Sequence, residues 1–190
     1  MLTGADGRRT ALVGGVGIVA LAAAILLAMG RVPYCSCGYV KAWHGVVMSS
    51  ENSQHLSDWY TPSHVIHGIA FYALLWLWAR HLSLHTRFLA AVGLEAAWEV
   101  IENTPMVINR YREATIALDY FGDSVLNSVA DILAMAVGFW MASAAPVALS
   151  LGFVVVMEVF VAFMIRDNLT LNVLMLVYPL DAIKRWQGGG

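Results

Sequence analysis

Long apolar runs, separated by short polar segments, constrain this chain more than any other feature of its sequence. The first run, Ala11–Gly30, contains no charged side chain. It is long enough to cross a bilayer, which takes about 20 helical residues. Over the whole chain 59% of the residues are hydrophobic and 13% are charged, whereas about 25% are charged in an average soluble domain. We therefore expect an all-α integral membrane protein whose surface faces lipid.

Five of the apolar runs are expected to be membrane-spanning helices. The 190 residues then form one integral membrane domain, 1–190, which is a polytopic transmembrane helical bundle without a separate soluble domain. A further apolar stretch, 169–183, is short and contains Pro179 and Asp181, so it is either a sixth span or a short interfacial or re-entrant helix. The five expected spans are 11–30, 62–80, 88–103, 123–142 and 147–165.

Positive charges set the expected orientation. Arg8 and Arg9 precede the first span, and Arg80 and Arg87 lie in the short connection between the second and the third. Cytoplasmic loops of membrane proteins are enriched in lysine and arginine. We therefore expect a cytoplasmic N-terminus and place the polar segment 31–60 on the outer side of the membrane.

The balance of charges excludes nucleic acid as a partner. The chain has 11 lysines and arginines against 13 aspartates and glutamates, for a net charge of −2. It therefore has no excess of positive charge with which to bind a phosphate backbone. The expected partners are the lipid bilayer, a lipid or lipid-linked substrate, and another membrane subunit or a second copy of the chain.

The two cysteines, Cys35 and Cys37, lie in the first polar segment. Two cysteines are too few for a disulfide scaffold. Because they are two residues apart, they would form a strained disulfide, and together with His44 they could instead hold a metal ion. A plain pair of thiols is the interpretation that we favour over either alternative.

Polar stripes run along three of the expected spans. An ionisable side chain in a span costs at least about 2.5 kcal/mol on insertion scales, so such residues have a functional or a pairing role by default. Because successive helices alternate in direction, the stripes should meet at one face of the membrane. The stripes are His64 and His67 on the second span, Glu95, Glu99 and Glu102 on the third, and Asp123, Asn127 and Asp131 on the fourth.

Imidazoles and carboxylates are the ligands that proteins use for Zn²⁺, Mn²⁺ or Fe²⁺, and facing helices of a bundle are where such sites are built. The stripes therefore predict a divalent metal site. The alternative is a packing network, in which these groups pair with one another, with arginines or with helix ends. The expected metal ligands are His64, His67, Glu99 and Asp123, the expected general base is Glu102, and the expected anion clamp is Arg110 with Arg112.

Several strings of residues carry a resemblance to a known family, and they are spread over most of the chain. They are 53–55, 58–68, 99–105, 110–112, 122–128 and 166–172. At these strings the sequence resembles a family of alphaproteobacterial inner-membrane proteins of unknown function. The resemblance implies a multi-pass protein of the bacterial inner membrane and implies no activity. The glutamate near one helix end and the Asp-x-x-x-Asn on the next also give a faint likeness to VanZ-type membrane proteins.

Two functions of different classes are consistent with these patterns. The first is a metal-dependent hydrolase that acts on a lipid or lipid-linked phosphate at the periplasmic face. The second is a non-catalytic membrane subunit or assembly factor, whose buried polar network serves packing and partner binding. Because the sequence contains neither a nucleophile motif nor a glycine-rich phosphate loop, whether the chain is an enzyme stays open at this point.

Overall fold

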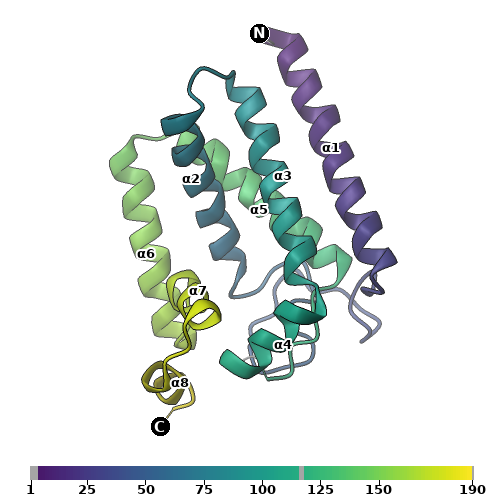
Figure 1. Ribbon diagram of the computed structural model, residues 1–190, viewed down its shortest axis with the longest axis vertical. Coiled ribbons are helices and arrows are strands. Elements are labelled where there is room, and N and C mark those ends of the chain that lie inside the picture. The colour runs from purple at the N-terminus through teal and green to yellow at the C-terminus, as the bar shows by residue number, and fades with distance from the viewer. Residues whose placement is uncertain (1–3, 116–117, 190) are drawn as a thin grey trace.

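The fold is a bundle of helices (Figure 1), seen in a computed structural model that describes residues 4–115 and 118–189. No strand is present among these residues, and an isolated bridge joins His44 to Asp58. The all-helical prediction is therefore confirmed. The helices are α1 (Gly4–Ala28), α2 (Thr61–Trp78), α3 (Leu84–Glu102), α4 (Pro105–Ala114), α5 (Val125–Ala144), α6 (Val147–Ile165), α7 (Leu169–Val177) and α8 (Asp181–Gln187).

Three of the described helices are long and apolar enough to cross a membrane. They are α1 from Asp6 to Ala28, α5 and α6. The expectation of five such spans is wrong by this measure, and α2 and α3 are the two that fall short. Each has enough residues, 18 and 19 respectively. Their polar stripes lower their mean hydropathy, however, and those stripes face other helices instead of lipid.

Helices α2 and α5 approach each other unusually closely. A Cβ atom added to Gly68 would lie 2.0 Å from the backbone oxygen of Met135. One added to Gly138 would lie 2.0 Å from the backbone oxygen of Val65. Small residues permit this kind of backbone contact between helices. The two glycines therefore fix how α2 and α5 face each other.

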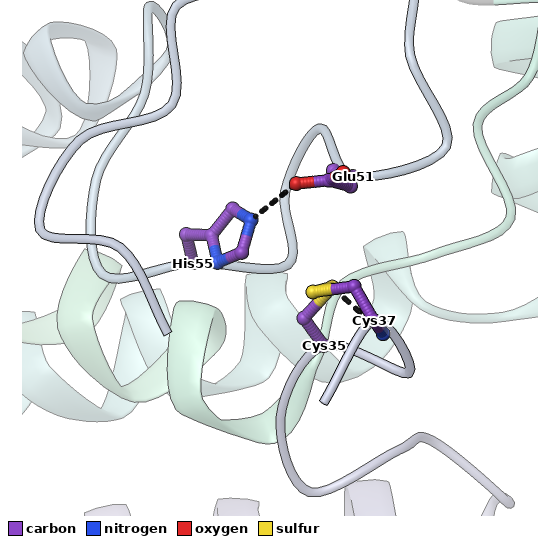
Figure 2. A group of neighbouring side chains, drawn as sticks. All are labelled: Cys35, Cys37, Glu51 and His55. Atoms are coloured by element: carbon purple, nitrogen blue, oxygen red, sulfur yellow. Dashed lines mark hydrogen bonds and ion pairs between the residues drawn. A yellow bond between two sulfur atoms is a disulfide. The ribbon is translucent and has the colours of Figure 1, made fainter. Parts of the chain in front are cut away.

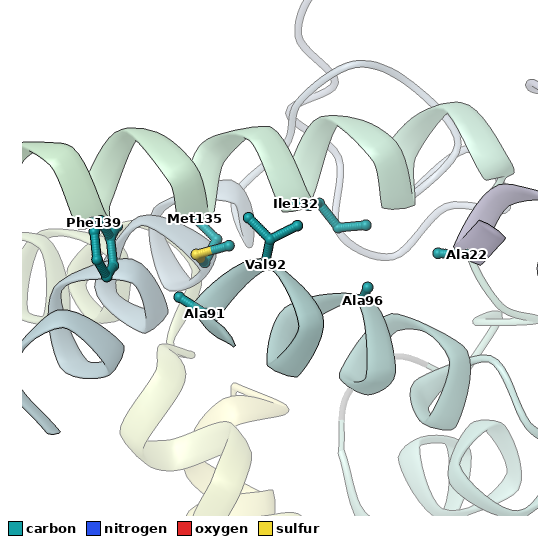
Figure 3. Close-up of a cluster of buried hydrophobic side chains, with 7 residues drawn as sticks. All are labelled: Ala22, Ala91, Val92, Ala96, Ile132, Met135 and Phe139. Atoms are coloured by element: carbon teal, nitrogen blue, oxygen red, sulfur yellow. The ribbon is translucent and has the colours of Figure 1, made fainter. Parts of the chain in front are cut away.

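An apolar core joins α1, α3 and α5 (Figure 3). Met135 and Phe139 of α5 are completely buried, and aromatic rings of α2 and α3 surround Phe139 at centroid distances of 5.3 and 5.4 Å. This packing holds the three helices that carry the polar stripes at fixed rotations. The core consists of Ala22, Ala91, Val92, Ala96, Ile132, Met135 and Phe139.

The loop 31–60 lies at the same end of the bundle as α4 and the start of α5 (Figure 1). Hydrogen bonds attach it to α5. The backbone oxygen of Ser53 accepts from the Ser124 amide at 3.0 Å, and that of Gln54 accepts from the Ser124 hydroxyl at 3.1 Å. The side-chain amide of Asn127 donates to the backbone oxygen of His55 at 3.0 Å. The loop is therefore a fixed cover over this end of the helices.

Four helix starts differ from the expected bounds: α1 begins at Gly4 instead of residue 11, and α2 begins at Thr61 instead of residue 62. The differences in α3 and α5 follow from their caps. Helix α3 begins at Leu84 rather than at residue 88, because the Ser83 side chain caps it by accepting from the Thr86 amide. Helix α5 begins at Val125 rather than at residue 123, because the Ser124 side chain caps it. Asp123 consequently lies just before the helix, not on its first turn.

The C-terminal apolar stretch, for which the sequence allowed either a span or a shorter helix, forms the short helices α7 and α8, broken near Pro179. With 9 and 7 residues, neither is long enough to cross a bilayer, which takes about 20 residues. The carboxylate of Glu158 on α6 accepts from the amides of Leu169 and Thr170, each at 3.0 Å. This contact fixes the first turn of α7 against α6.

Candidate functional site

The polar stripes of α2, α3 and α5 meet inside the bundle, at the end that the loop covers. His64 of α2 contacts the stripes of both α3 and α5. Its Nδ1 lies 2.6 Å from Glu95 Oε1 and 3.5 Å from Glu99 Oε1, and its Nε2 lies 3.8 Å from Asp131 Oδ2. The second histidine of α2, His67, places Nδ1 3.1 Å from both carboxylate oxygens of Glu95. We name these five residues the core centre.

Buried carboxylate oxygens in the core centre lack hydrogen-bond partners. Within the described part of the chain, this is true of both oxygens of Glu99 and of Oδ1 of Asp131. A buried charge is costly unless it is paired or hydrogen-bonded, and an unsatisfied buried group points to a missing water or ion. The core centre therefore offers lone pairs to a positively charged occupant.

The geometry gives three overlapping groups of ligands for a metal ion. In each group one ligand atom per residue lies within 4.8 Å of the others. His64 belongs to the first two groups and Glu99 to the last two. The groups are His64 with His67 and Glu95, His64 with Glu99 and Asp131, and Glu99 with Glu102 and Asp123.

A cavity of about 70 Å³ opens beside these groups. A water needs roughly 10–15 Å³ on this measure, so the space suits an ion with several waters. Among its described lining residues there is neither lysine nor arginine, whereas four carboxylates are present. The cavity is therefore suited to a cation. Its ionisable lining residues other than tyrosine are His64, His67, Asp58, Glu102, Asp123 and Asp131.

Asp58 reaches the cavity from the loop, which the sequence did not predict. The side chain is buried, and its oxygens accept from the amides of Ser53 and Tyr60 at 3.1 and 2.8 Å. Burial raises the pKa of the Asp58 carboxyl, and these hydrogen bonds oppose the shift. No helical periodicity marks a loop residue of this kind, so the sequence carries no pattern that would have revealed it.

The expected ligands fall into separate groups in the structure. His64 and Glu99 come together, and His67 joins His64 through Glu95. Asp123 lies with Glu99 and Glu102 instead of with the histidines. Its two oxygens already accept from the Asn103 side-chain amide at 2.7 Å and from the Tyr120 hydroxyl at 3.0 Å.

Glu95 and Asp131 are the two core residues that the expected ligand set omitted. Both belong to the stripes seen in the sequence, and both are buried, at 0% and 5% exposure. Helical spacing showed that they share a face with the other candidates. It could not show which members of a stripe turn toward the histidines, because that depends on how each helix is rotated against its neighbours.

The two arginines expected to clamp an anion are engaged elsewhere. Arg110 Nε donates to the backbone oxygen of Leu176 at 2.8 Å, and Arg112 Nε donates to that of Tyr120. Neither is among the described residues that line the cavity. The structure therefore does not bring the predicted anion clamp to the cavity, and Glu102 is the predicted catalytic residue that lines it.

The two cysteines form a disulfide in the structure, with Cα atoms 5.1 Å apart. The favoured interpretation of a plain thiol pair is therefore wrong. The backbone permits the bridge because the chain turns tightly after Cys35, whose backbone oxygen accepts from the amide of Gly38 at 3.1 Å.

Comparisons with known proteins identify relatives over nearly the whole chain. Residues 26–189 match the family described as "Protein of unknown function (DUF2585)". A UPF0314 protein of Rhizobium meliloti is 61% identical, covering 92% of this chain and 88% of its own length. Those of Paracoccus denitrificans and Sphingopyxis alaskensis are 56% and 51% identical, covering 90% and 96% of this chain and 88% and 97% of their own lengths.

No solved structure matches the chain. The relatives come from alphaproteobacteria, so the resemblance seen in the sequence is confirmed. The faint likeness to VanZ-type proteins finds no support among these relatives.

Proposed function

The chain belongs to the DUF2585 family, and we propose that it is a multi-pass protein of the bacterial inner membrane that binds a divalent metal ion at the core centre. One observation carries the proposal: both carboxylate oxygens of Glu99 are buried without a hydrogen-bond partner in the described structure, beside His64 and Asp131. Imidazole nitrogen and carboxylate oxygen together suit Zn²⁺, Mn²⁺ and Fe²⁺. The three apolar helices support a membrane location.

The balance of charge at the core centre supports a cation over a purely internal network. Three carboxylates, Glu95, Glu99 and Asp131, face two histidines. If all three carboxyl groups are ionised, one negative charge remains in a region of low dielectric even with both imidazoles protonated. A divalent ion compensates that charge directly and uses the lone pairs that no donor occupies.

We propose that the ion serves hydrolysis of a lipid or lipid-linked phosphate. When bound, it would polarise a phosphoryl oxygen and activate water for attack. Because Arg110 and Arg112 donate to backbone oxygens and are not among the described residues that line the cavity, the ion would also supply the positive charge that attracts phosphate. Water attacks the phosphorus, the bond to the leaving oxygen breaks, and Glu102 takes a proton from the water and returns it to the leaving group.

The position of the centre supports action at the periplasmic face. The N-terminus and the loop 31–60 lie at opposite ends of α1 (Figure 1). With Arg8 and Arg9 in the cytoplasm, the loop and the cavity beneath it would face the periplasm. Substrates would then be the phosphate groups of the outer leaflet.

A second candidate is a non-catalytic subunit or assembly factor, and one observation favours it. Around Asp123 the polar network is complete without an ion. The carboxylate accepts from Asn103 and Tyr120, and the Asp123 amide donates to the Asn103 side-chain oxygen at 2.7 Å. A network of this kind could serve to fix helix packing and to present a surface to a partner subunit or a second copy.

Metal analysis of the purified protein in detergent separates the two candidates. We expect bound Zn, Mn or Fe in the wild type, loss of most of it in Glu99→Gln, and normal content in Glu113→Gln, which changes an exposed glutamate on α4. The bound ion should also raise the Tm. A wild type without metal, whose Tm none of the three ions raises, would contradict the metal centre.

A further inference from the structure

A second group of metal-ligand side chains lies in the loop 31–60. The sulfurs of Cys35 and Cys37, a carboxylate oxygen of Glu51 and a ring nitrogen of His55 all lie within 4.8 Å of one another. Figure 2 shows the disulfide, with Glu51 and His55 beside it. This loop group shares no residue with the core centre, so the two sites can be tested separately.

The protein holds the His55 ring in place. The residue is 1% exposed. Its Nε2 lies 3.1 Å from Glu51 Oε2, and its Nδ1 accepts from the Lys41 amide at 3.2 Å. The rings of Tyr39 and His44 stand 5.8 and 5.2 Å from it. A ligand that the fold positions in advance costs less free energy to order when an ion binds.

Glu51 is held as firmly on the other side of the group. One of its oxygens accepts from the Tyr39 hydroxyl at 2.9 Å, and the other accepts from Lys41 Nζ at 2.6 Å. The carboxylate therefore stays beside the two sulfurs, and its negative charge faces them. Outside this group the described residues contain no cysteine, so thiolate chemistry in this protein belongs to the loop.

We propose that Cys35, Cys37, Glu51 and His55 form a redox-gated zinc site. Zn²⁺ prefers four tetrahedral ligands drawn from cysteine, histidine and carboxylate, with bonds of about 2.0–2.3 Å. Such bonds place neighbouring ligand atoms roughly 3.5 Å apart, so the four atoms need only small shifts. The oxidised form does not bind the ion, because metal ligation requires the thiolates that a disulfide lacks.

Zinc binding at the loop group takes two steps, reduction of the disulfide and then metal ligation. A dithiol reductant attacks the disulfide, becomes a disulfide itself, and leaves Cys35 and Cys37 with two electrons and two protons as thiols. Zn²⁺ then displaces both thiol protons. One ring nitrogen of His55 exchanges its contact with Glu51 or with the Lys41 amide for the ion, and Glu51 supplies the fourth ligand.

Spectroscopic titration of the full chain in detergent tests the site, with Co²⁺ as the probe in place of zinc. The protein is compared in its oxidised form and after reduction with a phosphine that is then removed without oxygen. We expect the near-ultraviolet absorption of a thiolate–cobalt bond in the reduced form, with an intensity that corresponds to one loop-bound Co²⁺ per chain at saturation, and we expect Zn²⁺ to abolish it. We expect no such absorption in the oxidised form. A reduced protein that shows none overturns the proposal.

Variants test the ligand set. Cys35→Ser with Cys37→Ser should abolish the absorption, and His55→Ala should weaken Co²⁺ binding at least about 10-fold. The control is His81→Ala, an exposed histidine in the connection between α2 and α3, which should bind as the wild type does. If His55→Ala unfolds, His55→Gln replaces it. Unchanged affinity in a folded His55 variant overturns the assignment.

The same experiment keeps the two metal proposals apart. The core centre contains no cysteine, so Co²⁺ bound there gives no thiolate absorption. Glu99→Gln should therefore lose core metal and keep the thiolate signature of the loop, whereas the double serine variant should do the reverse.

Discussion

His64 Nδ1 and Glu95 Oε1 lie 2.6 Å apart, and this contact links α2 to α3 inside the bundle. Both side chains are buried, at 8% and 0% exposure. Hydrogen bonds to an ionised carboxylate are about twice as strong as neutral ones. The pair therefore fixes the rotation of α2 against α3, two helices whose polar stripes are unsuited to contact with lipid. It also leaves Glu99 and Asp131 beside the same imidazole.

The effects of substitutions at the core centre on metal binding and function should not be additive. If one ion is shared, Glu99→Gln and His67→Ala should each abolish function and remove most of the bound metal while the protein still inserts. The double variant should be no worse than either single one, because coupled residues are strongly non-additive. Metal content per chain and Tm measure this. Separate packing pairs would instead give stability losses that add within about 0.5 kcal/mol, with Glu99→Gln nearly silent.

Larger side chains at the contact between α2 and α5 should destabilise the protein. Gly68→Ala and Gly138→Ala each place a methyl group against a backbone oxygen, so the helices must separate. We expect a loss of about 1–3 kcal/mol in the free energy of unfolding, which is typical of overpacking. Thermal unfolding in detergent measures it, with Gly152→Ala as the control, since that position on α6 has open space around it. Equal Tm values for all three variants would contradict the close approach.

The stability contribution of Asp167 should fall as the pH rises. This buried side chain accepts from the Asn168 amide, the Gln187 side chain and the Tyr60 hydroxyl. Burial raises its pKa from 3.8 to about 6. The folded protein therefore holds the proton more tightly than the unfolded chain does, and that stabilisation is complete below about pH 3.8 and lost as the pH rises through about 6.

The variant Asp167→Asn isolates this effect. Between pH 4 and pH 7 the free energy of unfolding of the wild type should fall by up to about 3 kcal/mol relative to that of the variant. This figure follows from about 1.4 kcal/mol for each unit of pKa shift. Unfolding at a series of pH values measures the difference. A difference that does not change with pH would show that the carboxyl titrates normally.

Reporter fusions should reveal the orientation. A reporter joined after Tyr60 is expected to be active only when it is a periplasmic enzyme, because the positive-inside rule predicts that Arg8 and Arg9, near the start of α1, keep the N-terminus in the cytoplasm. A reporter joined after Arg80, in the connection between α2 and α3, is the control, because it should lie on the opposite side of the membrane. Activity of a cytoplasm-only reporter after Tyr60 would invert the orientation and place the cavity at the cytoplasmic face.

The sequence predicted the helices and the meeting of the stripes because both depend on local spacing. Residues four apart, such as Glu95 and Glu99, share a helix face, and helices joined by short connections alternate in direction. The count of membrane-spanning helices failed for a related reason. The polar side chains of α2 and α3 lower the hydropathy of these helices, and only the packed structure shows that these side chains point inward.

The ligand set could be predicted only in part, because it depends on partners distant in the sequence. Asp123 was an equal candidate by spacing, yet Asn103 and Tyr120 occupy its oxygens. Asp58 approaches from a loop whose path is set by bonds to Ser124 and Asn127. The helical periodicity of a single segment contains no information about such contacts.

His55 contributes to the loop group and is also hydrogen-bonded to a residue of the cavity wall. Its ring belongs to the loop group, and its backbone oxygen holds the side chain of Asn127, which lines the cavity. A change at the ring that also shifts the His55 backbone would therefore shift a residue of the cavity wall. Thermodynamic linkage makes such an effect reciprocal: the factor by which an ion in the loop changes affinity at the core centre is also the factor by which an ion at the core centre changes affinity in the loop. If both proposed sites bind an ion, the redox state of the two cysteines would then affect how tightly the interior of the bundle holds its metal.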